Sequence, residues 1–177
     1  MKKTIASTRL FVVSLVLVFA LLTSVSCNIS YKFSGASIDY STTKTFSIQD
    51  FDNQAALVYP PAAQQFTEEL RTLFTRQTRL EEIPSNGDFD LQGSIVGYDL
   101  APVAVQEDAF AAITRFTLTV KVDFKNKQNE KKNFPRTFSA YADFDSSNIF
   151  SDVQDALLKE LTQDIVKQIF NATAEDW

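Results

Sequence analysis

Residues 115–124 read Arg-Phe-Thr-Leu-Thr-Val-Lys-Val-Asp-Phe and alternate strictly between polar and apolar side chains. The apolar members are Phe116, Leu118, Val120, Val122 and Phe124. Because successive side chains of a β-strand point to opposite faces of the sheet, this period of two predicts a strand with one dry and one wet face.

Three further strands are predicted around this one. A charged loop, Lys125 to Asn133, leads to a partner strand with apolar residues at every second position from 134 to 144, interrupted only by Arg136. Residues 89–100 form a third strand, whose alternation slips near Gly93 and Gly97 and so predicts a bulge. A short run at 44–51 is the fourth strand.

Two amphipathic helices complete the predicted domain. Apolar residues recur at helical spacing from Pro61 to Thr78, with proline tolerated in the first turn. A second helix is expected to begin with a capping box formed by Ser151 and Gln154, to carry Lys167 near its end, and to run to about Asn171. Its stripe comprises Val153, Leu157, Leu161, Ile165 and Ile169.

The element order predicts an α+β fold in which two helices pack on one face of a four-stranded, mostly antiparallel sheet. Each helix has one apolar stripe and each strong strand has one apolar face, so a two-layer α/β sandwich buries all of them together. We assign this domain to residues 44–177.

The first 26 residues have the pattern of a secretory signal peptide. Lys2, Lys3 and Arg9 precede an apolar run from Leu10 to Leu22, and small and polar residues follow. That run has 13 residues, whereas a helix needs about 20 to span a bilayer. Export with cleavage after residue 26 is therefore favoured over a permanent transmembrane helix.

Cys27 is the sole cysteine of the chain, and an exported protein with one cysteine needs an explanation for it. A free thiol and an intermolecular bridge are two readings. The third is lipidation, in which Cys27 becomes the first mature residue and carries diacylglycerol and an N-acyl chain, which together make a stable anchor. The polar segment 27–43 then reads as a tether.

Charge excludes one class of partner. Removal of the signal peptide takes away Lys2, Lys3 and Arg9 and no acidic residue, so the net charge falls from −5 to −8. An acidic domain lacks the basic footprint of a nucleic-acid-binding protein.

No catalytic or metal centre is predicted. The chain has no histidine, which removes triad catalysis and most transition-metal sites, and its four glycines form no phosphate-binding loop. An enzyme that uses carboxylates alone would rely on pairs such as Asp143 and Asp145, although aspartate is ordinary near turns. We expect neither an enzyme nor a cofactor other than the lipid.

Basic residues offer one candidate site. Lys125 and Lys127 belong to the charged loop, and Arg115 and Lys121 lie on the wet face of the strand before it. They are either a solvated surface or a contact for phosphate on an anionic glycolipid.

Several stretches, spread over the whole mature chain, resemble the LptE-type lipopolysaccharide-assembly lipoproteins of Bacteroidetes-like bacteria. They are Lys44-Thr-Phe-Ser-Ile-Gln-Asp-Phe, Gln65-Phe-Thr-Glu-Glu-Leu, Gly93-Ser-Ile-Val-Gly-Tyr-Asp-Leu-Ala-Pro-Val-Ala, Thr119-Val-Lys-Val, Phe138-Ser-Ala-Tyr-Ala-Asp-Phe-Asp-Ser and the closing Trp177. No single piece is a catalytic fingerprint, so the specificity lies in the set.

The resemblance implies a lipid-anchored outer-membrane protein that plugs the LptD β-barrel, helps to assemble it and thereby completes lipopolysaccharide delivery. It also implies two helices on a four-stranded sheet and no catalytic residues. No acidic run follows Cys27, which favours the periplasmic face. The alternative is a free periplasmic lipoprotein that binds a small ligand or glycan in an apolar pocket between sheet and helices.

Replacing Cys27 tests the anchor. We expect Cys27→Ala to abolish metabolic labelling by a radioactive or clickable fatty acid, because the thiol is the acylated atom. Labelling that persists in the variant would mean that the processing site is wrongly assigned.

Overall fold

The computed structural model describes residues 38–57, 59–103 and 112–175. The chain divides after Phe33, and all described residues belong to the unit Ser34–Trp177. The predicted signal peptide, Cys27 and most of the predicted tether lie outside the described residues.

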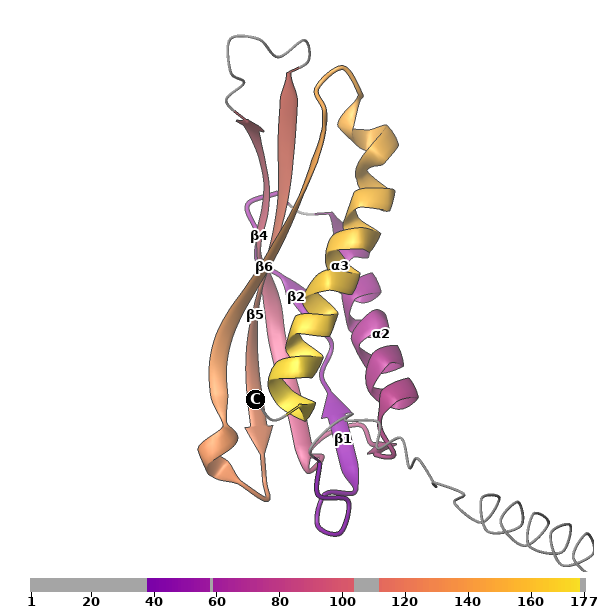
Figure 1. The fold of residues 1–177 in the computed structure, drawn as a ribbon, viewed down its shortest axis with the longest axis vertical. Helices are drawn as coiled ribbons and strands as arrows, with labels where there is room; N and C mark the ends of the chain where they lie inside the picture. The colour runs from indigo at the N-terminus through magenta and orange to yellow at the C-terminus, as the bar shows by residue number, and fades with distance from the viewer. Residues whose placement is uncertain (1–37, 58, 104–111, 176–177) are drawn as a thin grey trace, which may run out of the picture. The chain divides into compact units, whose positions relative to one another are not determined.

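The described residues form one sheet with two helices on one of its faces (Figure 1). In chain order the elements are β1 (Thr45–Ile48), β2 (Asp52–Asn53), α2 (Pro60–Gln77), β3 (Glu81–Glu82), β4 (Phe89–Val103), β5 (Ile113–Asn126), a short 3-10 turn (Glu130–Lys132), β6 (Phe134–Asp145) and α3 (Phe150–Ala174). The strand order is β3-β1-β4-β5-β6, with β2 beside β4. The predicted α+β class with both helices on one face is confirmed.

The sheet itself corrects the predicted number of strands. It has six strands, because the two-residue strands β2 and β3 join the four that were predicted. It is also mixed: β4, β5 and β6 are antiparallel, whereas β1 runs parallel to β4, with Phe46 opposite Phe89. The helix between β1 and β4 explains this direction, since a crossover connection returns the chain to the same end of the sheet.

The predicted dry face of β5 is the centre of the core. Its five apolar side chains are at most 2% exposed. Facing residues of both helices are equally buried: Phe66, Leu70, Phe74, Leu158, Leu161 and Ile165. Phe74 of α2 meets Phe170 of α3 edge-on, with ring centroids 5.2 Å apart.

The predicted bulge in β4 is confirmed, because its register against β5 shifts between Ile95 and Gly97. Just before the bulge, the backbone of Gly93 lies close to the Lys121 carbonyl and the Phe51 ring. A Cβ atom there would lie 2.2 Å from the Lys121 carbonyl oxygen and 2.6 Å from the Phe51 ring. Only glycine lets that ring cross the strand at this point.

The helix α2 matches its prediction to within one residue at each end. The start of α3 does not. It begins at Phe150, with Ile149 as N-cap and no capping side chain. The predicted capping box is wrong because the Phe150 ring packs 5.3 Å from the ring of Phe116 and draws the helix start forward. Gln154 instead donates to the hydroxyl of Tyr98 at 2.7 Å.

The far end of α3 also differs from the prediction. The helix continues to Ala174, three residues beyond Asn171, and its last turn holds no basic residue. Lys167 therefore lies within the helix rather than at its end. This extension carries Ala172 and Thr173 to the β5–β6 hairpin.

A core truncation tests the packing of the two helices. We expect Phe74→Ala to lower the free energy of unfolding by about 3–5 kcal/mol, because it leaves a cavity between Phe46 and Phe170. Urea unfolding measures the change, and the exposed neighbour Thr75→Ala is the matched control. Equal losses in the two variants would contradict this account of the core.

Candidate functional site

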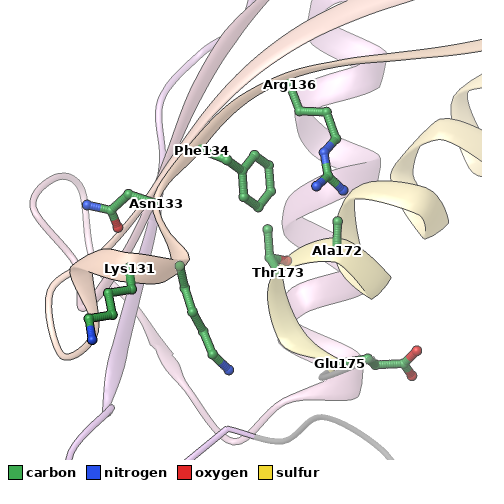
Figure 2. Close-up of a pocket in the computed structure, with 8 residues that line it drawn as sticks. Lys131, Asn133, Phe134, Arg136, Ala172, Thr173 and Glu175 are labelled. Carbon is green, nitrogen blue, oxygen red and sulfur yellow. The ribbon is translucent and has the colours of Figure 1, made fainter.

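A hollow lies between the β5–β6 hairpin and the last turn of α3, and we call it the basal pocket (Figure 2). Its volume is about 360 Å³. Its walls come from Lys131, Lys132, Asn133, Phe134, Arg136, Ala172, Thr173 and Glu175. Three of these eight side chains are cationic and one is acidic, so the pocket is basic in a domain with an acidic sequence.

Asparagine side chains build the hairpin that forms one wall. The backbone N–H of Asn126 donates to Asn133 Oδ1 at 2.6 Å. Asn126 Oδ1 accepts from the N–H groups of Gln128 and Asn129, and Asn129 Oδ1 accepts from that of Lys131. These local bonds replace the lost strand ladder and fix the turn that carries Lys131 and Lys132.

Arg136 supplies the cation nearest to β6. It lies in the apolar row of that strand, but its side chain is exposed, and its guanidinium stacks 4.7 Å from the Phe134 ring centroid and 5.9 Å from that of Phe138. β6 is an edge strand, where Pro135 is tolerated because proline has no N–H to donate to a further strand. The arginine that interrupts the apolar row is therefore stacked on its neighbours and directed toward the end of α3 (Figure 2).

A second, smaller hollow of about 240 Å³ lies on the other side of the α3 terminus. Ile38 and Phe89 line it together with the hairpin residues Asn126 and Gln128, and it shares Lys132 and Thr173 with the basal pocket. The two hollows therefore flank the same helix end.

Asp88 ties this end of the sheet together. Its Oδ2 accepts from the backbone N–H groups of Lys44 at 2.7 Å and Thr45 at 3.0 Å, and its Oδ1 accepts from the Gln128 side chain at 3.1 Å. These bonds, the one from Lys44 first, hold the pKa of Asp88 below its usual value of 3.8, although partial burial opposes them. One carboxylate thus joins β1, β4 and the hairpin.

The four predicted contact residues do not gather at one place. Arg115 makes a bidentate ion pair with Asp143 (Nε–Oδ1 2.7 Å), and its guanidinium lies 3.8 Å from the centroid of the Tyr141 ring. The hydrogen bonds of this pair raise the pKa of Arg115 and lower that of Asp143. Its charge is therefore largely balanced.

The other three lie farther along the strand and hairpin. Lys121 lies six residues from Arg115 on the outer face of β5, about 20 Å away at strand spacing. Lys125 is exposed on the same face, and the Lys127 ammonium donates to the carbonyl of Asn86. The sequence analysis did not predict that the hairpin, Arg136 and the end of α3 lie together. Residues near 131 and near 173 are far apart in sequence, and local periodicity carries no information about such contacts.

The carboxylates considered for catalysis have local structural partners. Asp143 is paired with Arg115, and Asp145 accepts from the backbone N–H of Ser147 at 2.8 Å. Hydrogen bonds from Ser147 lower the pKa of Asp145, so both carboxylates favour the ionised state rather than that of an acid catalyst. Within the described ranges no group of three or more Asp, Glu, His or Cys residues could hold a metal ion.

Comparison with known proteins identifies a family. The model of the LptE family, described as lipopolysaccharide-assembly, matches residues 43–173. A crystal structure of a protein from Xanthomonas campestris superposes with a TM-score of 0.51 at 8% identity and covers 75% of this chain and 84% of the other. At that identity the likeness concerns the fold alone.

Two lipoprotein structures are similar at lower scores. A minor lipoprotein from Acinetobacter baumannii has a TM-score of 0.48 at 17% identity, covering 73% of this chain and 91% of that one. The rare lipoprotein B from Shewanella oneidensis has a TM-score of 0.47 at 12% identity, covering 71% and 92%. No curated protein matches the chain.

Removing the charge of Asp88 tests whether this carboxylate holds β1, β4 and the hairpin together. The folded pKa is depressed, so the ionised carboxylate stabilises the fold above the unfolded pKa, and this stabilisation is lost as the pH falls through the folded value. We expect Asp88→Asn to cost about 1 kcal/mol at neutral pH and to flatten the loss of stability below about pH 4.

Urea unfolding at a series of pH values measures both effects. The exposed Asp164→Asn is the matched control and should retain the wild-type acid profile. Identical profiles for Asp88→Asn and the wild type would show that this carboxylate does not join the three elements.

Proposed function

This chain belongs to the LptE family of lipopolysaccharide-assembly lipoproteins, and we propose that it plugs and helps to assemble an LptD-like outer-membrane β-barrel. The match of the family model to residues 43–173 carries this proposal, because it spans nearly the whole described domain. The family is not enzymatic and acts with LptD and lipopolysaccharide. In this role the domain contributes a rigid body and a binding surface rather than a reaction.

The anchor is the second part of the proposal. Cleavage before Cys27 and acylation of its thiol would tie the domain to the outer membrane at its periplasmic face, through the tether 27–43. Within the described residues, no helix is long and apolar enough to cross a membrane. A lipid anchor supplies membrane attachment without such a helix.

The packed interior disfavours the alternative of a small-ligand or glycan carrier. That reading needs an apolar cavity between the sheet and the helices. Core side chains fill this layer instead, among them Phe46, Phe66, Phe116 and Leu118, each without exposure. The basal pocket lies at the end of this layer and has a partly basic wall.

Lipopolysaccharide contact is the third part, and we place it on the outward side of the hairpin. Lys125 is exposed on the same face as Lys121, and the Lys127 ammonium donates to the Asn86 carbonyl, whereas the charge of Arg115 is balanced by Asp143. Ammonium groups on a projecting hairpin can reach the phosphates of an anionic glycolipid. Plugging a barrel does not require this contact.

Co-purification tests the barrel partner. We expect the tagged full-length protein, extracted from native envelopes in mild detergent, to bring a large outer-membrane β-barrel in near-equal amount. An unrelated lipoprotein with the same tag is the control, and mass spectrometry identifies the partner. Absence of a barrel, together with normal surface lipopolysaccharide after depletion of this protein, would rule out the assembly role.

Neutralising the hairpin tests lipopolysaccharide contact separately. We expect Lys125→Gln with Lys127→Gln to weaken lipopolysaccharide binding by about 30-fold, since each lysine near an anionic lipid surface contributes about 1 kcal/mol. The exposed Lys159→Gln on α3 is the control. Unchanged affinity in the double variant would move the lipid contact elsewhere while leaving the barrel role intact.

A further inference from the structure

The outer edge of β6 is an unpaired strand edge that runs for 12 residues, from Phe134 to Asp145. It can be followed in Figure 1 from the β5–β6 hairpin to the loop that leads into α3. Within the described part of the chain, no further strand pairs with this edge. An unpaired edge presents a row of backbone N–H and C=O groups that can bind another strand, and natural proteins commonly block it with charges, prolines or bulges.

These protective features are confined to the two ends of β6. Pro135 and Arg136 lie at one end, and Asp143 and Asp145 lie at the other. Residues 137–142 read Thr-Phe-Ser-Ala-Tyr-Ala, carry no charge, and pair with β5 without a bulge. The middle of this edge is therefore open to a partner strand.

The hydrogen bonds between β5 and β6 determine which residues face outward. The N–H of Ser146 donates to the carbonyl of Ala112 at 2.9 Å, and this pair continues the unbroken register of the two strands by one position. Bonded and non-bonded pairs alternate along an antiparallel ladder, so the even-numbered residues of β6 bond to β5. The odd-numbered residues from 137 to 143 therefore direct their N–H and C=O groups outward. Pro135, which has no N–H, belongs to the same outward series.

We propose that β6 pairs with β6 of a second copy of this chain, antiparallel to it and about a two-fold axis at Ala140. In such a pairing the same edge serves both copies, so its side chains have to complement themselves. Residues that lie opposite each other also point to the same face of the joined sheet. The pairing goes beyond the role as a barrel plug and does not depend on it.

An axis at Ala140 makes the helix side of the joined sheet self-complementary. Phe138 then lies opposite Ala142 of the second copy, and Ala140 lies opposite its own counterpart. These are the close, non-bonded pairs of the new ladder, where a large ring fits beside a methyl group. Arg136 lies opposite Phe144, so a guanidinium that already stacks on Phe134 gains another ring.

The outer face is complementary in the same register. Thr137 lies opposite Asp143 of the second copy, where its hydroxyl can donate to the carboxylate. A shift of the axis by one residue in either direction would place Arg136 opposite Ala142 or Ser146, where it meets no ring. The edge thus carries its own complement, which favours a second copy over an unrelated extended segment.

Disulfide trapping tests the axis in native envelopes that contain the full-length protein. The Cα atoms of a non-bonded antiparallel pair are about 4.5 Å apart, within the range of a disulfide. Two copies of residue 137 would instead be about 20 Å apart at strand spacing. On oxidation we expect Ala140→Cys to give a disulfide-linked dimer in at least about tenfold higher yield than the exposed control Thr137→Cys. The wild type, whose one cysteine is Cys27, gives the background.

Proline at an outward position tests the backbone pairing. Ser139→Pro removes one outward N–H from each copy and leaves the backbone bonds to β5 in place, so the fold is retained. We expect the dissociation constant of the dimer to rise at least about tenfold, because two hydrogen bonds are lost in each dimer. Sedimentation of the purified full-length protein in detergent measures it. Ser139→Ala keeps the N–H and should dimerise as the wild type does, and far-ultraviolet circular dichroism checks the fold of every variant.

Three results would overturn the proposal. A wild-type protein that sediments as a single copy at every concentration, with no disulfide in Ala140→Cys, would mean that the edge does not pair with itself. Equal yields from Ala140→Cys and Thr137→Cys would indicate random collision instead of the proposed axis. Loss of the co-purified barrel in Ser139→Pro, without a disulfide-linked dimer of Ala140→Cys, would assign the edge to a strand of the barrel partner.

Discussion

Burial of the apolar row of β5 is the constraint on which the other elements depend. Hydrogen bonds to β4 and β6 hold the strand on both sides, and the row from Phe116 to Phe124 needs a cover along its whole length. The cover is supplied by two helices that meet through Phe74 and Phe170. The burial of this row therefore sets the length of α3, and with it the place where the helix end meets the hairpin.

Among the described residues no helix covers the opposite face of the sheet, which carries small polar residues, the Arg115–Asp143 ion pair and the exposed Lys121 and Lys125. Thr119 and Ser139 share a hydrogen bond across β5 and β6 at 3.1 Å, and Arg115 is held by Asp143. Tyr141 is 60% exposed and lies over the arginine. A sheet face that is covered on one side only can meet water on the other when it carries polar side chains.

Local periodicity predicted those parts of the fold that repeat. The faces of β5, the stripe of α2 and the bulge near Gly97 all follow from residues a few positions apart. Periodicity could not reveal β2 and β3, because two residues have no period, nor the parallel direction of β1, which depends on a partner distant in sequence. The capping box at Ser151 failed because the packing of Phe150 outweighed a weak local preference.

The candidate site was harder to predict for the same reason. The hairpin lysines could be found from sequence, since they cluster within a few residues. The sequence showed Arg136 as the one charged residue in an apolar row. Its proximity to the end of α3 depends on tertiary packing and could not be predicted from that row. The balanced charge of Arg115 likewise depends on the register that sets it opposite Asp143.

The direction of β1 also has a mechanical consequence. The strand follows the first described residues and runs parallel to both β3 and β4. A force applied along the axis of β1 would load its inter-strand hydrogen bonds together in shear rather than open them one after another. Under such a force, β1 would separate from β3 and β4 only when several hydrogen bonds break together. The bonds that Asp88 accepts from the backbone N–H groups of Lys44 and Thr45 add resistance at the amino end of β1.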